Sequence, residues 1–172
     1  PLKINTIRGI SVFINSSVFT LIILVLAFSV WAFFKTRSRA NVLFAGVCLC
    51  VLGYTCYPLL HTYLALRVQP WFSLEMLFYY LTFPAMLLLE HEITGRKYKW
   101  VWWLVGFTAA AGIGATVAGI FAGGMETAAL SYGVSAVTEV LKWFTAICLV
   151  VIAFFYTEGT RGLPLLAGTV LY

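Results

Sequence analysis

Long runs of apolar residues, each of a length that crosses a lipid bilayer, constrain this chain more than any other feature. The runs cover residues 16–34, 41–66, 71–89, 100–122 and 132–156, and a further apolar stretch begins at Leu163. A transmembrane helix needs about 20 mostly apolar residues, whereas transmembrane strands are about half as long and alternate in polarity. The predicted fold is therefore an all-α, polytopic transmembrane helical bundle with five complete spans plus the start of a sixth.

The composition favours the same class. Apolar residues make up 62% of the 172, and charged residues only 10%. This balance excludes a disordered chain and is unusual for a soluble domain. We therefore expect an integral, multi-pass protein of the cell membrane, with the lipid bilayer as its surroundings.

The two ends of the sequence suggest a piece of a longer protein. The chain begins at Pro1 rather than Met, and it stops at Tyr172, about ten residues into a stretch that would need roughly 20 to cross a bilayer. The start also lacks the pattern of a secretory signal peptide. We divide the chain into an N-terminal segment, residues 1–15, and a helical bundle, residues 16–172.

Basic residues gather after the first and third spans. The two clusters are Lys35, Arg37 and Arg39, then Arg96, Lys97 and Lys99. The connections on the other side offer only Arg67 and Glu126, so the positive-inside rule places both clusters in the cytoplasm and the N-terminal segment outside. The net charge of +5 then reflects membrane orientation, and no nucleic-acid partner is expected.

Small residues recur at every fourth position of the fourth span. They are Gly106, Ala110, Gly114, Ala118 and Ala122. Such a stripe lets another helix backbone approach closely. The approaching helix could belong to the same bundle, or to a second subunit in a homodimer or larger membrane complex, and both alternatives stay open.

No metal or cofactor site is evident among the cysteines and histidines. Cys48, Cys50, Cys56 and Cys148 all fall within spans, where a thiol behaves as a small apolar group. His61 and His91 are expected near opposite membrane surfaces, so they cannot both ligate one haem within a subunit. The Glu90-His91-Glu92 run could bind a cation, but neighbouring side chains diverge around a helix, so a solvated helix end is expected.

No catalytic motif is recognisable in this sequence. It contains no nucleophile and base pairing, phosphate-binding glycine loop or paired-cysteine zinc motif. We therefore expect a protein that is not an enzyme, with no metal site and an unknown cofactor requirement.

Glu139 and Lys142 lie inside the fifth apolar run. A charge at the bilayer centre costs roughly 2.5 to 17 kcal/mol, so such residues usually face the protein interior and often carry function. The spacing of three lets the two side chains meet on a helix, and a purely structural ion pair is the simpler alternative. Glu75 in the third span is expected at a similar depth. Two carboxylates and one ammonium do not balance, so one carboxylate holds a proton or finds a partner in another helix, water or a ligand.

Two stretches resemble a known family. They are "RSRANVLFAGVCLCVLGYTCYPLL", residues 37–60, and "FSLEMLFYYLTFPAMLLLEHEITGRKYKWVWW", residues 72–103. Together with an external N-terminus and the turn at Gly95, they resemble the seven-transmembrane sensor regions that precede histidine kinase, cyclase or phosphatase domains in bacteria, including the "diverse intracellular signalling" type. The likeness covers roughly residues 16–160 and lacks a seventh span and an output domain.

This resemblance implies a membrane-embedded sensor that passes a signal to a cytoplasmic domain or partner, in a bacterial inner membrane. The competing interpretation is a non-catalytic structural or transport subunit of a membrane complex. Short loops, few charges and a small-residue stripe would suit that class equally well.

Overall fold

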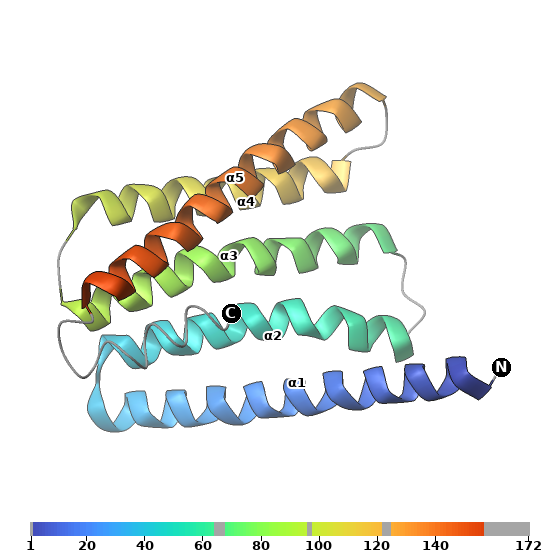
Figure 1. The fold of residues 1–172 in the computed structure, drawn as a ribbon, viewed down its shortest axis with the longest axis horizontal. Helices are drawn as coiled ribbons and strands as arrows, with labels where there is room; N and C mark the ends of the chain where they lie inside the picture. The colour runs from blue at the N-terminus through green and yellow to red at the C-terminus, as the bar shows by residue number, and fades with distance from the viewer. Residues whose placement is uncertain (1, 64–67, 96–97, 122–124, 157–172) are drawn as a thin grey trace. The chain divides into compact units, whose positions relative to one another are not determined.

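In the described part of the computed structural model, five α-helices correspond to the five complete apolar runs (Figure 1). The structure describes residues 2–63, 68–95, 98–121 and 125–156, and the side chains of residues 12–56, 60, 72–95, 98–121 and 132–155. The helices are α1 (Leu2–Thr36), α2 (Arg39–Tyr63), α3 (Val68–Thr94), α4 (Lys99–Phe121) and α5 (Met125–Tyr156). Each is long and apolar enough to span a membrane, and the described ranges contain no strand. The all-α class and the five spans are confirmed, whereas the sixth stretch from Leu163 lies outside the described residues.

The helices extend beyond the apolar runs that predicted them. The backbone of α1 is helical from Leu2, although the apolar run that predicted this helix begins at residue 16. Likewise α3 continues to Thr94, past the predicted end at residue 89. Hydropathy marks the lipid-soluble part of a helix, while the hydrogen-bonded backbone continues through flanking polar residues. The external location of segment 1–15 stays a prediction.

Left-handed residues terminate α1 and α3. Arg37 follows α1 with φ 54°, and its N–H donates to the carbonyl of Phe33 at 2.7 Å. Gly95 follows α3 with φ 65°, and its N–H donates to the carbonyl of Glu92 at 3.3 Å. A left-handed residue that satisfies the last carbonyls is a common helix cap, and glycine adopts it without steric cost. Arg37 belongs to the first basic cluster and Gly95 directly precedes the second, so both helices end at a basic cluster.

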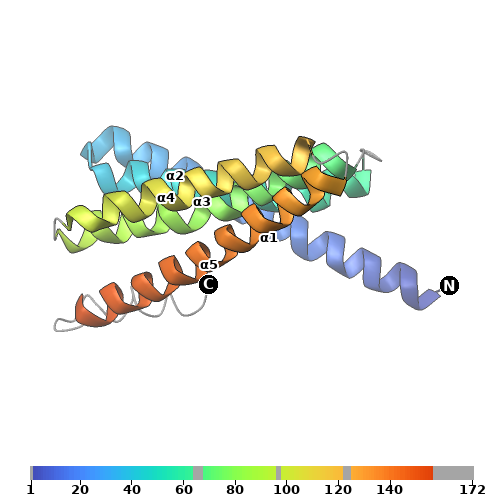
Figure 2. The same ribbon diagram turned by 90° about the horizontal axis from the view of Figure 1, so that it is seen from above.

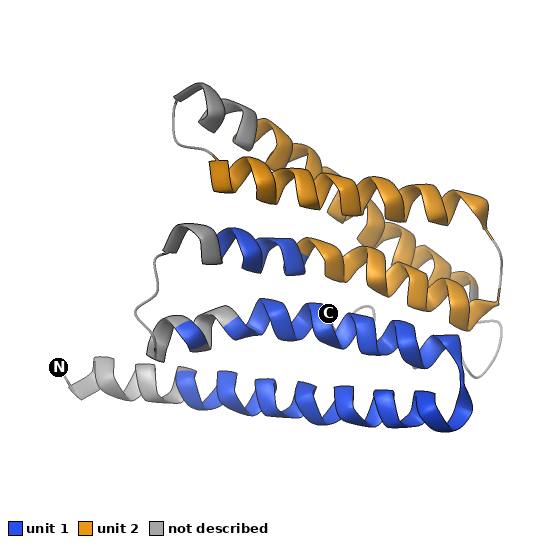
Figure 3. Ribbon diagram, turned by 180° about the vertical axis from the view of Figure 1, so that it is seen from behind, with its two compact units in different colours: residues 1–79 blue, residues 80–172 orange. Residues whose placement is uncertain are grey.

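The chain divides into two compact units (Figure 3). Unit 1, residues 1–79, holds α1, α2 and the first part of α3. In this unit α1 and α2 run antiparallel and pack side by side (Figure 1). The backbone of α2 also comes so close to α3 at Gly53 that a Cβ atom there would collide with the ring of Phe78. Glycine is therefore required at this crossing.

Unit 2, residues 80–172, holds the rest of α3 together with α4 and α5. Leu87 of α3, Val101 and Leu104 of α4, and Leu149 of α5 form its buried apolar core. Figures 1 and 2 show α5 crossing α4 obliquely. All three helices of unit 2 thus contribute to one core, which fixes the polar side chains described next.

Candidate functional site

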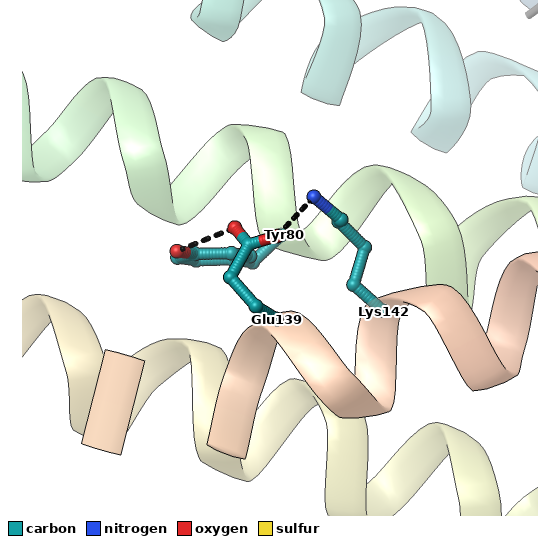
Figure 4. A network of polar contacts seen from close by, with 3 residues as sticks. All are labelled: Tyr80, Glu139 and Lys142. Carbon is teal, nitrogen blue, oxygen red and sulfur yellow. Dashed lines mark hydrogen bonds and ion pairs between the residues drawn. The ribbon is translucent and has the colours of Figure 1, made fainter. Parts of the chain in front are cut away.

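A polar network connects α3 to α5 within unit 2 (Figure 4). Lys142 forms an ion pair with the Oε2 atom of Glu139, one helical turn away on α5. Tyr80 of α3 donates its hydroxyl proton to the Oε1 atom of Glu139 at 3.2 Å. The two oxygens of one carboxylate therefore have different partners on two helices. We call Tyr80, Glu139 and Lys142 the polar network.

The two charges of the network differ in exposure. The side chain of Lys142 is 8% exposed, whereas that of Glu139 is 42% exposed. This follows from their positions on α5, whose buried residues recur at spacings of three and four: Thr138, Lys142, Thr145, Leu149 and Ala153. Lys142 lies on that buried face, and Glu139 lies beside it. Glu139 is therefore the charged residue of the network that a partner outside unit 2 could reach.

Two aromatic rings lie close to the buried ammonium group. The Nζ atom of Lys142 lies 6.0 Å from the ring centroid of Phe83 and 5.1 Å from that of Trp143. Aromatic faces attract cations, and the attraction increases where water is excluded. Two rings and one carboxylate thus stabilise this charge in an apolar unit.

Three fully buried threonines lie between α4 and α5, and we call them the threonine seam. The hydroxyl of Thr138 contacts two carbonyl oxygens, that of Val134 at 2.8 Å and that of Ala111 on α4 at 3.1 Å. The hydroxyls of Thr108 and Thr145 lie 3.2 Å apart across the same interface. Because each hydroxyl has only one proton, it can donate only one of these hydrogen bonds at a time. The stabilisation from the contacts is therefore smaller than the sum of all of them. The seam joins the helices without a further charge.

A close helix crossing fixes the position of Tyr80. A Cβ atom added to Gly112 of α4 would lie 2.9 Å from the Cβ atom of Tyr80. The obstacle is the base of a side chain rather than its flexible end, so α3 would have to move. Gly112 therefore holds α3 close to α4 at the residue that donates to Glu139.

The predicted small-residue stripe on α4 lies on another face. Gly106 and Ala110 are exposed, and a Cβ atom at Gly106 would meet nothing within 4 Å. Gly114 and Ala118 are half-buried, and a Cβ atom at Gly114 would make an ordinary 3.8 Å contact with Val134. Of Gly106, Gly112 and Gly114 on α4, the one in a tight contact is thus Gly112, which is not part of the predicted stripe. In the structure Gly112 shares the buried face of α4 with Thr108 and Thr116, a face that the sequence alone did not mark.

Glu75, the third predicted member of the intramembrane site, belongs to unit 1. It lies on α3 and is buried, with 9% of its surface exposed. The polar network lies in unit 2. An approach of Glu75 to Glu139 and Lys142 therefore stays a prediction.

The expectation of a solvated helix end at Glu90-His91-Glu92 is wrong for two of the three residues. Glu90 is 3% exposed and His91 is 7% exposed, whereas Glu92 is exposed. The physical reason is the extra length of α3. Because the helix continues to Thr94, these residues still pack within unit 2.

The remaining candidate ligands form no metal site in the part of the chain that the structure describes. All four cysteines are free thiols. No group of three or more histidine, cysteine or acidic residues comes together among the described residues. The side chain of His61 lies outside them. The described geometry therefore identifies no group of residues that would hold a metal ion.

Comparison with known proteins gives no match: no family model, curated protein or solved structure is similar enough to this chain to assign it to a family. The functional argument therefore depends on the geometry of unit 2.

Proposed function

We propose that this chain is a membrane-embedded signal-transduction module whose responsive element is the polar network. The observation that supports the proposal most directly is the shared carboxylate of Glu139, which joins Tyr80 of α3 to Lys142 of α5. One group thus links two helices and neutralises a buried charge. A change at this carboxylate would act on both helices at once.

The energetics favour a switch over a passive contact. Removing one partner from a buried ion pair costs about 3–5 kcal/mol, because the remaining charge lacks compensation. A hydrogen-bond donor or cation that occupied the half-exposed carboxylate of Glu139 would leave the ammonium of Lys142 in an apolar unit. The helices would then have to rearrange to give that ammonium water or a new partner. A ligand shifts a conformational equilibrium only by such a difference in affinity between two states.

The resemblance to seven-transmembrane sensor regions adds the direction of the signal. In that family the membrane module precedes a cytoplasmic output domain. We propose the same direction here, with the basic clusters on the cytoplasmic side, since the positive-inside rule favours that orientation. The cell membrane is then the site of action.

One observation favours the alternative, a structural or transport subunit of a membrane complex. Gly106 and Ala110 leave part of α4 exposed and without bulky side chains. Another protein helix could pack there closely. Under this alternative the polar network stabilises unit 2 and transmits nothing.

The full-length protein distinguishes the two proposals. The sequence that follows Tyr172 is determined first, and the activity of any soluble domain encoded there is then measured in membrane vesicles. We expect Glu139→Gln to change that activity at least severalfold, while the exposed control Glu92→Gln leaves it at the parental level. A chain that ends soon after a sixth or seventh span, or an output that ignores Glu139→Gln in a folded protein, would contradict the sensor proposal.

A further inference from the structure

Two consecutive side chains near the end of α3 carry buried polar atoms without partners. Glu90 is 3% exposed and His91 is 7% exposed. Neither carboxylate oxygen of Glu90, nor the Nδ1 atom of His91, has a hydrogen-bond partner among the described residues. Nearly all buried polar groups in proteins are hydrogen-bonded, so each exception requires an explanation.

The surroundings of these residues are apolar and aromatic. Glu90 follows Leu87 by three positions, which places both on one face of α3. Leu87 is fully buried and belongs to the core of unit 2 with Val101 and Leu104 of α4. The ring of His91 meets that of Trp102 edge-on, with centroids 6.3 Å apart. Glu90 thus lies beside the α3–α4 part of the core.

The charged groups of the neighbouring elements give Glu90 no compensating partner in the described structure. The groups that follow Glu90 on α3 are His91 and Glu92, and α4 begins with Lys99, which is exposed. Two further titratable but uncharged side chains, Tyr98 and Cys148, pack against the same core. The described part of α5 after Lys142 contains no charged side chain. Arg96 and Lys97 connect α3 to α4 and lie outside the described residues.

An ionised carboxylate in such a place is costly, because its lost hydration is not replaced. The cost disappears when the group takes up a proton and becomes neutral. We propose that Glu90 is a proton-binding site: one O–H bond forms when a proton arrives from water at the exposed end of α3, and it breaks when the proton returns there. No electrons are transferred.

The consequence is a pH-sensitive contact between α3 and α4. Release of the proton places an uncompensated negative charge beside Leu87, Val101 and Leu104, and this charge favours separation of the two helices or entry of water. The site uses none of the residues of the polar network. It therefore goes beyond the proposed sensing function, and either can fail without the other.

Infrared spectroscopy of the full-length protein in lipid bilayers tests the proposal. A protonated carboxyl group has a carbonyl stretching band that an ionised carboxylate lacks. We expect a component of this band at neutral pH that is lost as the pH is raised and that is missing from Glu90→Gln, a neutral variant of nearly the same shape. The matched control Glu92→Gln, two residues away and exposed, should retain it. A parental protein without the band at neutral pH, or a band that persists unchanged in Glu90→Gln, would overturn the proposal.

A second variant keeps the test valid if Glu90→Gln does not fold. All acidic residues in this sequence are glutamate, so Glu90→Asp introduces its only aspartate. Aspartate labelled with carbon-13 at the side-chain carboxyl is incorporated into this variant and into the parental protein, and the difference between their spectra then reports on position 90. A protonated, isotope-shifted band at neutral pH would support the proposal, and a band from the ionised carboxylate alone would refute it.

Discussion

Tyr80 and Glu139 are separated by 59 positions in the sequence, yet the tyrosine hydroxyl donates to the glutamate carboxylate at 3.2 Å. The carboxylate also compensates the ammonium group of Lys142. The hydrogen bond thus connects α3, through the uncharged side chain of Tyr80, to the ion pair on α5.

The unequal exposure of the ion pair predicts unequal costs for removing its members. Glu139→Leu leaves the ammonium of Lys142, 8% exposed, without its carboxylate and should lower the free energy of unfolding by about 3–5 kcal/mol. Lys142→Met should cost less, because Glu139 is half-exposed and keeps the Tyr80 hydrogen bond. The double variant should be close to the parent, since apolar residues often replace a buried pair without loss. Chemical unfolding in detergent micelles measures all three, and equal costs for the two single changes would contradict this prediction.

The crossing at Gly112 should tolerate no larger residue. Gly112→Ala places a methyl group against Tyr80, so α3 must shift, and overpacking of this kind costs about 1–3 kcal/mol. Gly106→Ala is the matched control on the same helix, because the added methyl group meets nothing within 4 Å. The control should be neutral or more stable by up to about 1 kcal/mol, from the higher helix propensity of alanine. Thermal unfolding compares the two, and similar midpoints would argue against the close crossing.

Particular residues show which parts of the fold and of the polar network could be predicted from the sequence. The length of the apolar runs predicted five helices, and the spacing of Glu139 and Lys142 predicted that their side chains meet. Tyr80 and Gly112 were not predicted, because their roles depend on the rotation of α3 and α4 about their own axes. Hydropathy carries little of that information when a helix is apolar on every face.

The burial of Glu90 was missed for a related reason. A drop in hydropathy after residue 89 suggested that the helix ends there in water. The helical backbone continues to Thr94, so it carries the carboxyl group into the protein interior. Polarity of a residue type thus failed as a guide to its exposure.

The threonine seam should contribute little compared with the ion pair. Thr145→Val removes the contact with Thr108 and keeps the shape of the side chain. Hydrogen bonds between membrane helices average about 0.6 kcal/mol, and here each hydroxyl also has a carbonyl partner on its own helix. We therefore expect a loss below about 1 kcal/mol in the same unfolding assay. A loss as large as that of Glu139→Leu would contradict this prediction and show that the seam contributes as much to the stability of unit 2 as the ion pair does.

The basic clusters should face the cytoplasm. Single cysteines at positions 38 and 97, in a background without native cysteines, should react with a membrane-impermeant thiol reagent only after the membrane is opened, because the positive-inside rule retains both clusters inside. A cysteine at Gln69 should react in intact cells. External labelling at position 97 would show the opposite orientation and contradict the cytoplasmic direction of the proposed signal.

The most direct test of the central claim is the distance between α3 and α5 in bilayers, measured by pulsed electron paramagnetic resonance. Spin labels at the exposed positions Ile93 and Val150 report it in the cysteine-free background. If the polar network is a switch, Tyr80→Phe should move a substantial fraction of molecules to a second distance, because about 1.4 kcal/mol changes a two-state ratio tenfold. The control Gly106→Ala should retain the parental distribution. A folded Tyr80→Phe protein that also retains it would contradict the account and reduce the network to a structural contact.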